Sequence, residues 1–168
     1  MKNRNLYLVI FGVSGSGKTL MGKMLAKNLG IEFIEGDDFH SLMNVEKMKS
    51  GHPLTDADRM PWLYILKNEI QTRITNNKDF VLSCSALKIE YRDILRKAGN
   101  IRFLFLNVSE NVVSGRLMHR KAHFMPPSLL HSQIETLERP QKTEKDIIVV
   151  NASQSPQKVL DDILAGLS

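Results

Sequence analysis

The sequence has one cysteine and no long hydrophobic run. A disulfide needs two cysteines, so an internally bridged fold is excluded. Cys84 lies in a run of apolar and small residues, and its side chain is predicted to be buried in the core. A single unpaired cysteine is typical of a protein from a reducing compartment, which favours the cytoplasm. No apolar segment approaches the roughly 20 residues that cross a bilayer, so we expect no membrane anchor. The run 6–11 follows two basic residues, as in a signal peptide, but it is short and no small-residue cleavage site follows it.

Repeats, low-complexity tracts and linkers rich in proline or serine are also missing. The 168 residues fit the usual size of one domain, roughly 100–200 residues. A chain of this length buries about 70% of the surface that its unfolded form exposes, enough for a core without metal or disulfide support. We therefore expect a single domain over residues 1–168.

The net charge of +5 is concentrated in one stretch, because residues 86–121 hold eight basic and three acidic side chains and the rest of the chain is neutral. Such a stretch can be a solvated helix face, an anion site or a nucleic-acid patch. Its aromatic residues are Tyr91, Phe103 and Phe105, and both phenylalanines fall in a predicted strand. Nucleic-acid binding by stacking is therefore not expected.

Short apolar runs alternate with segments of helical period along the whole chain. The predicted strands are 6–11, 32–34, 80–83, 102–106 and 147–150, and apolar residues at helical spacing fall within 20–29, 63–74, 94–95, 112–117 and 159–167. This alternation predicts an α/β fold with a five-stranded parallel sheet covered by helices. Residues 36–61 fit poorly and look like an insertion at one edge, and residues 119–128 look like a loop with a proline pair.

The strongest local signal is Gly12-Val-Ser-Gly-Ser-Gly-Lys-Thr19, a complete G-x-x-x-x-G-K-[ST] between a predicted strand and a predicted helix. Backbone N–H groups of such a loop and the helix N-terminus bind phosphate oxygens. Lys18 would bridge the β- and γ-phosphates and Thr19 would coordinate Mg²⁺. The alternative is a flexible Gly/Ser turn, which does not require Gly-Lys-Thr. The residues predicted to bind the nucleotide here are Gly12, Ser14, Gly15, Ser16, Gly17, Lys18 and Thr19.

Phosphate loops occur in kinases, GTPases, helicases and transport ATPases. The chain leaves little room for the extra elements of a motor or helicase, and the Asn/Thr-Lys-x-Asp signal of GTPases is missing. A small kinase that uses ATP and Mg²⁺ is therefore predicted.

A second polar segment, Glu35-Gly-Asp-Asp-Phe-His40, follows the second predicted strand. In a parallel sheet it would lie at the carboxyl ends of the strands, facing the phosphates. A carboxylate there can accept the proton of an attacking hydroxyl or hold Mg²⁺. The alternative is that Asp37 or Asp38 caps the next helix.

The sequence resembles the gluconokinase family, small phosphate-loop kinases that phosphorylate D-gluconate on its 6-hydroxyl. The resemblance covers nearly the whole chain, and the runs Gly-x-Pro-Leu-x-Asp-x-Asp-Arg-x-Pro-Trp-Leu and Cys-Ser-Ala-Leu-Lys are its most specific marks. The segments that carry it are Gly12–Thr19, Glu35–His40, Asn44–Met48, Ser50–Leu63, Cys84–Lys88, Tyr91–Arg96, Gly115–Phe124 and Gln133–Glu138. It implies a P-loop NTPase fold of the nucleoside- and shikimate-kinase type, with helices on both sheet faces, a lid at 119–128 and an acceptor-binding insertion at 36–61. It also implies a homodimer that binds neither nucleic acid nor membrane.

The resemblance assigns roles on the acceptor side. Asp37 would be the general base, and Glu35 would lie near the metal, in a place where shikimate kinases carry a shorter aspartate. The residues implied to line the acceptor site are His40, Lys47, Arg59 and Arg92, with His123 from the lid. Arginine can grip a carboxylate such as that of gluconate through two parallel hydrogen bonds. Asp56 and Asp58 flank Arg59 and could orient it, or Arg59 could be a surface arginine paired with them.

On the nucleotide side, Arg116 and Arg120 are four residues apart, hence on one helix face. By resemblance to kinases of the adenylate-kinase type, Arg116 would stack on adenine and Arg120 would stabilise charge on the transferring group. The alternative is two solvated arginines. The segment Asn151-Ala-Ser153 would contact the adenine edge.

Two alternatives stay open from the sequence. The acceptor could be shikimate, a nucleoside or another sugar acid on the same fold. A nucleotide-binding regulator that uses the basic stretch 86–121 on RNA or DNA is the second alternative. The histidines show no metal-ligand spacing, so Mg²⁺ is expected to arrive with ATP.

Overall fold

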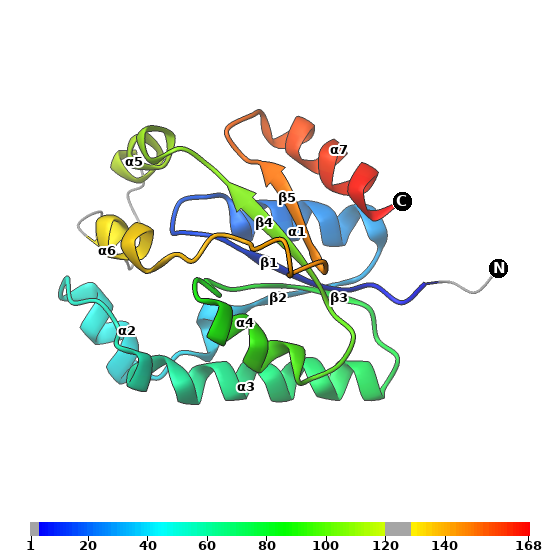
Figure 1. Ribbon diagram of the computed structural model, residues 1–168, viewed down its shortest axis with the longest axis horizontal. Coiled ribbons are helices and arrows are strands. Elements are labelled where there is room, and N and C mark those ends of the chain that lie inside the picture. Colours follow the sequence, from blue (N-terminus) through cyan, green and yellow to red (C-terminus); the bar gives the residue numbers. More distant parts are fainter. Residues whose placement is uncertain (1–3, 120–128) are drawn as a thin grey trace.

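The computed structural model describes residues 4–119 and 129–168, and its centre is a parallel sheet (Figure 1). The strands are β1 (Tyr7–Phe11), β2 (Glu32–Glu35), β3 (Phe80–Ser83), β4 (Arg102–Asn107) and β5 (Ile147–Asn151). Their order is β2-β3-β1-β4-β5, and all neighbouring pairs are parallel. The five predicted strands are confirmed, each within one residue at either end.

Helices cover both faces of the sheet, as the resemblance implied. On one face lie α1 (Lys18–Leu29) and α7 (Pro156–Leu167), and on the other lie α3 (Asp56–Thr75) and α4 (Ile89–Arg96) (Figure 1). Side chains of a strand alternate between the two faces. In β1, Leu8 and Ile10 pack toward α1 and α7, whereas Val9 and Phe11 pack toward α3 and α4.

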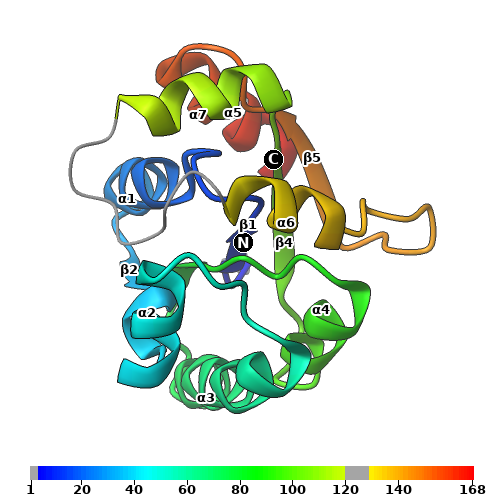
Figure 2. The same ribbon diagram turned by 90° about the vertical axis from the view of Figure 1, so that its left-hand side faces the viewer.

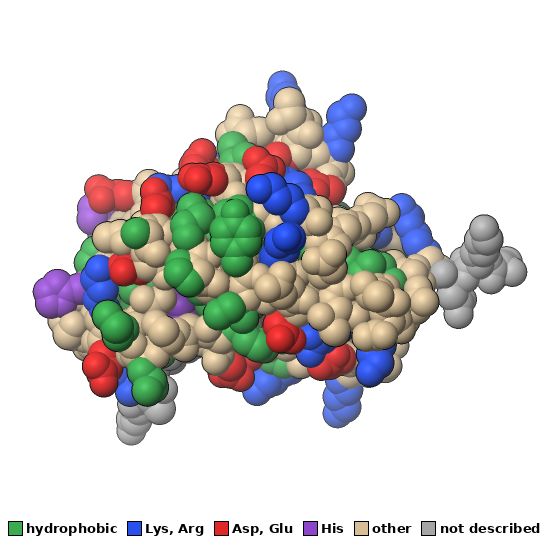
Figure 3. Space-filling view, turned by 90° about the horizontal axis from the view of Figure 1, so that it is seen from below, with side chains coloured by type: hydrophobic (Ala, Val, Ile, Leu, Met, Phe, Trp, Pro, Cys, Tyr) green, Lys and Arg blue, Asp and Glu red, His purple; other side chains and the backbone are tan. Residues whose placement is uncertain are grey.

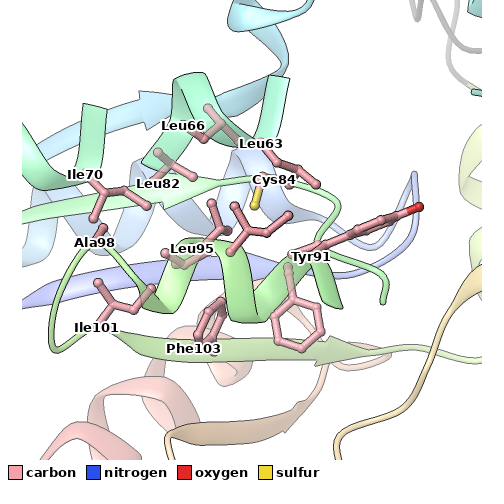
Figure 4. Close-up of a cluster of buried hydrophobic side chains, with 14 of the residues drawn as sticks. Leu63, Leu66, Ile70, Leu82, Cys84, Tyr91, Leu95, Ala98, Ile101 and Phe103 are labelled. Atoms are coloured by element: carbon pink, nitrogen blue, oxygen red, sulfur yellow. The ribbon is translucent and has the colours of Figure 1, made fainter. Parts of the chain in front are cut away.

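The core between the sheet and the helices α3 and α4 is apolar and closely packed (Figure 4). Leu63, Leu66 and Ile70 of α3 meet Leu95 of α4 there, and each of the four is fully buried. Cys84 lies in the same cluster with 1% of its surface exposed, and burial raises the pKa of its thiol to about 12. The prediction that Cys84 is buried is therefore confirmed.

Three helical segments were not predicted. They are the 3-10 turn η1 (Gly36–Phe39), α2 (Leu42–Lys49) and α6 (Leu129–Thr136). Two of them, η1 and α2, lie in the stretch 36–61, which also contains the first turns of α3. The helix α3 begins at Asp56 because Thr55 and Asp58 form a capping box there. Pro61 lies inside this helix and does not end it.

The outward face of α3 and α4 carries basic, acidic and apolar side chains close together (Figure 3). Three of the eight basic residues of the stretch 86–121, namely Lys88, Arg92 and Arg96, pair with carboxylates. Lys88 contacts Asp56, and Arg96 contacts Asp93, Glu144 and Asp146. Of the three alternatives for this stretch, the solvated helix face fits Lys88 and Arg96, whose charges are paired at the surface.

The carboxyl ends of the strands meet at one edge, where the phosphate loop, η1 and the end of β3 lie together. Figure 2 looks onto this edge, with α2 and α3 on one side and α7 and α5 (Glu110–Met118) on the other. Within the described ranges, no helix combines the length and apolarity that a membrane crossing requires.

Candidate functional site

The phosphate loop forms the turn between β1 and α1. Gly15 and Gly17 have φ values of 80° and 99°, in the left-handed region that glycine adopts without strain. Gly17 is the N-cap of α1, and no side chain caps this helix end. The buried hydroxyl groups of Ser14 and Ser16 have no hydrogen-bond partner among the described residues. Uncapped helix N–H groups and unpaired hydroxyls fit a loop whose partners are phosphate oxygens.

A glutamine far along the chain holds this loop in place. The Ser14 backbone N–H donates to Gln133 Oε1 at 2.6 Å, and Gln133 is 5% exposed on α6. The sequence analysis quoted the segment 133–138 as part of the family resemblance but assigned Gln133 no role. If α6 had been predicted, Gln133 would have stood out as a polar residue on the buried face of that helix.

The two predicted metal ligands are in direct contact. Thr19 Oγ1 donates to Glu35 Oε2 at 2.5 Å, and Ser83 Oγ donates to Glu35 Oε1 at 2.8 Å. Glu35 reaches both because it ends β2 in register with Ser83 of β3. A carboxylate and a hydroxyl are the hard oxygen ligands that suit Mg²⁺. Ser83 was missed by the sequence analysis, although a serine that ends an apolar run was visible there.

Lys18 lies at the start of α1, and its Nζ donates to the Val13 carbonyl at 3.0 Å, which directs the ammonium over the loop. No group of three or more His, Cys, Asp and Glu residues in the described part of the chain could hold a metal ion by itself. Mg²⁺ at Thr19 and Glu35 would therefore complete its ligands with nucleotide oxygens and water.

Asp37 lies in η1 at the same edge of the sheet. Burial is the main cause that raises the pKa of its carboxyl to about 6; the Lys18 charge acts in the opposite direction, and the Glu35 charge acts with burial. At neutral pH Asp37 is therefore a carboxylate with a higher proton affinity than an exposed aspartate. The side chain of Glu35 caps η1 by accepting from the Asp37 N–H, and that of Ser41 caps α2, so the alternative that Asp37 or Asp38 caps the next helix is wrong.

His40 faces Asp37 from the end of η1. Its Nε2 is 3.9 Å from Asp37 Oδ1, and its side chain is 3% exposed. The ring stacks on Trp62 with centroids 4.0 Å apart, and the Trp62 indole N–H donates to the Gly36 carbonyl. Burial and then the Arg59 charge lower the pKa of His40 to about 4, so it is neutral at neutral pH.

Arg59 is 8% exposed, and its Nη1 donates to the Tyr91 hydroxyl at 3.1 Å. That hydroxyl in turn donates to Asp56. The expectation that Asp56 and Asp58 orient Arg59 by ion pairing is wrong, because they pair with Lys88 and with Lys47 instead. Tyr91 orients Arg59 in their place, and Arg59 directs its charge toward His40.

Lys47 of α2 forms an ion pair with Asp58 at 2.6 Å and keeps 37% of its side chain exposed. The hydrogen bond from Lys47, together with those from Thr55, lowers the pKa of Asp58 to about 2. The ammonium has three donors, so this pair leaves room for another acceptor. Substrate binding by Lys47 stays a prediction.

The structure corrects the expectation for Arg92. All five of its N–H donors are used inside the protein, and its side chain is fully buried. Nε and Nη2 donate to the two carboxylate oxygens of Glu144, Nη1 donates to the Ala86 and Leu87 carbonyls, and Nη2 also donates to the Glu138 carbonyl. Arg92 therefore joins α4 to the segment before β5 and has no donor left for a substrate.

A pocket of about 490 Å³ lies beside the phosphate loop on the β4–β5 side. Arg116 of α5 lines it and donates to the Gly15, Ser16 and Ala152 carbonyls at 3.4, 3.3 and 2.7 Å. The other lining residues are Gly15, Ser16, Gly17, Leu20, Met21, His119, Ala152, Gln154, Pro156 and Val159. Its place next to the loop suits the base and sugar of a nucleotide.

Ser153 is not among the residues that line this pocket, and its contact with the adenine edge stays a prediction. Its backbone N–H donates to Asn151 Oδ1 at 3.0 Å, and its neighbours Ala152 and Gln154 face the pocket instead. Arg120, His123 and the predicted lid at 119–128 lie outside the described residues, except for His119.

Comparison with known proteins identifies the family. Residues 8–140 match a family model described as an AAA domain. The chain is 43% identical over 154 residues to the thermosensitive gluconokinase of Escherichia coli K12, covering 91% of this chain and 82% of that one. It is 44% identical over 159 residues to the gluconokinase of Gluconobacter oxydans, covering 94% and 89%. The chain belongs to the gluconokinase family.

Solved structures agree with this membership. A gluconokinase from Sinorhizobium meliloti superimposes with a TM-score of 0.87 and 44% identity, over 98% of this chain and 93% of that one. A shikimate kinase at 20% identity shares the fold, with a TM-score of 0.64. The gluconokinase family and the P-loop kinase fold inferred from the sequence are thus confirmed.

Proposed function

We propose that this gluconokinase-family protein transfers the γ-phosphoryl group of ATP to the 6-hydroxyl of D-gluconate. The observation that carries the proposal is Asp37, a carboxylate with a raised pKa at the edge of the sheet that holds the phosphate loop. A carboxylate there can take the proton of an attacking hydroxyl while the phosphoryl group is held by the loop. The names of the relatives support gluconate as the acceptor.

The phosphate side of the reaction is assigned to Lys18, Thr19 and Glu35. Lys18 neutralises charge on the β- and γ-phosphates as a point charge, and the loop N–H groups bind their oxygens. Mg²⁺, when bound with ATP, neutralises charge that develops on the phosphates. Thr19 and Glu35 would hold it, because their oxygens already lie together at the start of α1.

The acceptor side is assigned to Arg59, His40 and Lys47. Arg59 is buried with one of its N–H donors on Tyr91, which leaves further donors for the substrate carboxylate. His40 and Lys47 provide hydrogen-bond donors to sugar hydroxyls. This set of one guanidinium and several polar groups matches a small polyol with one carboxylate.

The nucleotide side is assigned to Arg116, with Arg120 as the residue that stabilises the transferring group. Arg116 lines the pocket beside the loop, where its guanidinium can pack on the base. We assign Arg120 from its spacing and from the family resemblance. We infer a cytoplasmic location from the single, buried cysteine and a homodimeric state from the resemblance, and light scattering of the purified protein measures the second.

Release of ADP by the purified protein with Mg-ATP tests this function. D-gluconate is compared with shikimate, glucose, other sugar acids, nucleosides and no acceptor. We expect gluconate alone to give a large rate, with phosphate on the 6-hydroxyl as seen by ³¹P NMR. A large rate with another acceptor alone would replace gluconate and require a new assignment of Arg59. Lack of stimulation by any acceptor would reject the kinase proposal.

A further inference from the structure

Asn44, which has no assigned role, contacts the histidine beside the proposed base. It lies in the first turn of α2 and is 8% exposed. Its amide nitrogen Nδ2 donates to the backbone carbonyl of Asp58 at 2.9 Å and lies 3.4 Å from His40 Nδ1. One amide group therefore connects the start of α3 to the imidazole ring of His40.

The Asp58 carbonyl determines which way round the Asn44 amide lies. A carbonyl oxygen only accepts hydrogen bonds, so the NH₂ end of the amide and not its oxygen must face Asp58. The same NH₂ group then faces His40 Nδ1, and it can only donate there. His40 Nδ1 is therefore the acceptor in this pair.

The position of the proton on the imidazole ring follows from this hydrogen bond. His40 is neutral, because it is buried and Arg59 lies nearby, and a neutral imidazole carries one N–H. With Nδ1 as an acceptor, the hydrogen lies on Nε2. Stacking on Trp62 keeps the ring in one plane, and the Trp62 hydrogen bond to the Gly36 carbonyl keeps the indole in place.

The Nε2–H group points toward the reacting end of the site. The distance of 3.9 Å from Nε2 to Asp37 Oδ1 is too long for a direct hydrogen bond. A hydroxyl oxygen between the two groups can accept from His40 and donate to Asp37 at the same time. The opposite tautomer would place two acceptors around one hydroxyl and would compete with Asp37 for its proton.

We propose that Asn44 is a positioning residue that fixes His40 as the Nε2–H tautomer, so that His40 donates a hydrogen bond to the acceptor hydroxyl whose proton Asp37 accepts. The proposal rests on the proposed kinase function, since it concerns the same acceptor hydroxyl. It adds a residue, Asn44, that acts through His40 and does not touch the substrate.

Ring ¹⁵N NMR of the protein without substrate tests the tautomer directly. The His40 signals are assigned as those that disappear in His40→Gln. In the wild type we expect a protonated Nε2 and an unprotonated Nδ1. In Asn44→Asp the carboxylate can only accept, so we expect the proton to move to Nδ1 or the ring to become charged. A wild-type ring protonated at Nδ1 would overturn the proposal, whatever the substrate of the enzyme is.

A matched pair of variants tests the hydrogen bond in turnover. The amide of His40→Gln reaches the place of Nε2, whereas the shorter amide of His40→Asn reaches the place of Nδ1, and both lose the stacking on Trp62. With gluconate and ATP saturating, we expect kcat of the glutamine variant to exceed that of the asparagine variant by about tenfold, the worth of one hydrogen bond. The KM for ATP should be the same in both.

Equal kcat values in two folded variants would overturn the role of Nε2–H. Thermal unfolding of both variants checks that they fold alike. Asn44→Asp should lower kcat and leave the KM for ATP unchanged, and unchanged kcat in that variant would remove Asn44 as the positioning residue. A wild type inactive on gluconate but with the expected tautomer would reject the proposed substrate and not the placement of the proton.

Discussion

Arg59 and Arg92 are both buried, but they differ in how many of their donors the protein uses. Arg59 lies at the carboxyl edge of the sheet and gives one hydrogen bond to Tyr91. Arg92 lies behind it on α4 and gives all five of its donors to Glu144 and to three backbone carbonyls. Burial alone therefore does not distinguish the arginine that we propose to bind the substrate from the structural one. The number of donors that remain available does.

The carboxylates in the two regions around these arginines also differ, in their pKa values. At the sheet edge, burial raises the pKa of Asp37 to about 6, and the nearby Lys18 charge offsets only part of that rise. In the α4 region, burial alone would raise the pKa of Glu144, but the hydrogen bonds from Arg92 and Arg96 bring it to about 2. One carboxylate is adapted to take a proton and the other to keep a fixed charge.

The largest expected effect is on Asp37. Asp37→Asn removes the proton acceptor and should lower kcat by about a hundredfold to ten thousandfold, the usual worth of a general base. The KM for ATP should change little, because the phosphate loop is intact. Steady-state kinetics with gluconate measures both. Turnover near the wild-type rate would show that Asp37 is not the base.

The next effect is on stability, at Arg92. Arg92→Lys keeps the charge but has three donors for five hydrogen bonds, and it should lower the free energy of unfolding by about 2–3 kcal/mol, about 1 kcal/mol for each hydrogen bond lost. The KM for gluconate should remain that of the wild type in the folded fraction. Urea unfolding measures the free energy of unfolding, and steady-state kinetics at low temperature measures the KM for gluconate. A raised KM with unchanged stability would restore Arg92 to the acceptor site.

Arg59→Lys is the same substitution at the other arginine, and we expect it to affect substrate binding more than stability. It should raise the KM for gluconate by about tenfold or more, because a lysine cannot give two parallel hydrogen bonds to a carboxylate. The free energy of unfolding should fall by only about 1 kcal/mol, the worth of the bond to Tyr91. If instead Arg59→Lys unfolds the protein as readily as Arg92→Lys does, the distinction by free donors is wrong.

The smallest effect concerns pH and Glu144. Its pKa is lower in the folded protein than in the unfolded chain, so its charge stabilises the fold above the ordinary pKa of 4.5. That contribution is lost as the pH falls from there toward about 2. Glu144→Gln should therefore lose less stability than the wild type over this range, as measured by urea unfolding at several pH values. Parallel pH curves for the two proteins would contradict the assignment.

Local sequence patterns were enough for the sheet and the phosphate loop. The strands are short runs of buried apolar residues, and Gly12–Thr19 is contiguous, so neither depends on distant partners. The helix α2 was missed because its apolar residues do not all lie on one buried face, so they do not repeat at helical spacing. Its first two residues, Leu42 and Met43, are 82% and 81% exposed. The segment 35–40 was expected to face the phosphates because the carboxyl ends of parallel strands meet at one edge, and the contact of Glu35 with Thr19 agrees with that expectation.

The site residues that were missed or misassigned depend on contacts across the fold. Ser14 meets Gln133 over 119 positions, and Arg92 meets Glu144 over 52. The neighbours of an arginine in sequence do not reveal which carboxylate reaches it in space. For the same reason Asp56 and Asp58, which flank Arg59, turned out to pair with lysines.

The central strand β1 separates the residues assigned to the acceptor from the nucleotide pocket. Groups assigned to the acceptor come from residues 35–91, on the β2–β3 side, and the nucleotide pocket beyond the loop is built from residues 116–159, on the β4–β5 side. Substitutions that retune acceptor choice therefore need not disturb the nucleotide pocket. A lineage with this fold can exchange one substrate for another while its phosphate donor stays the same.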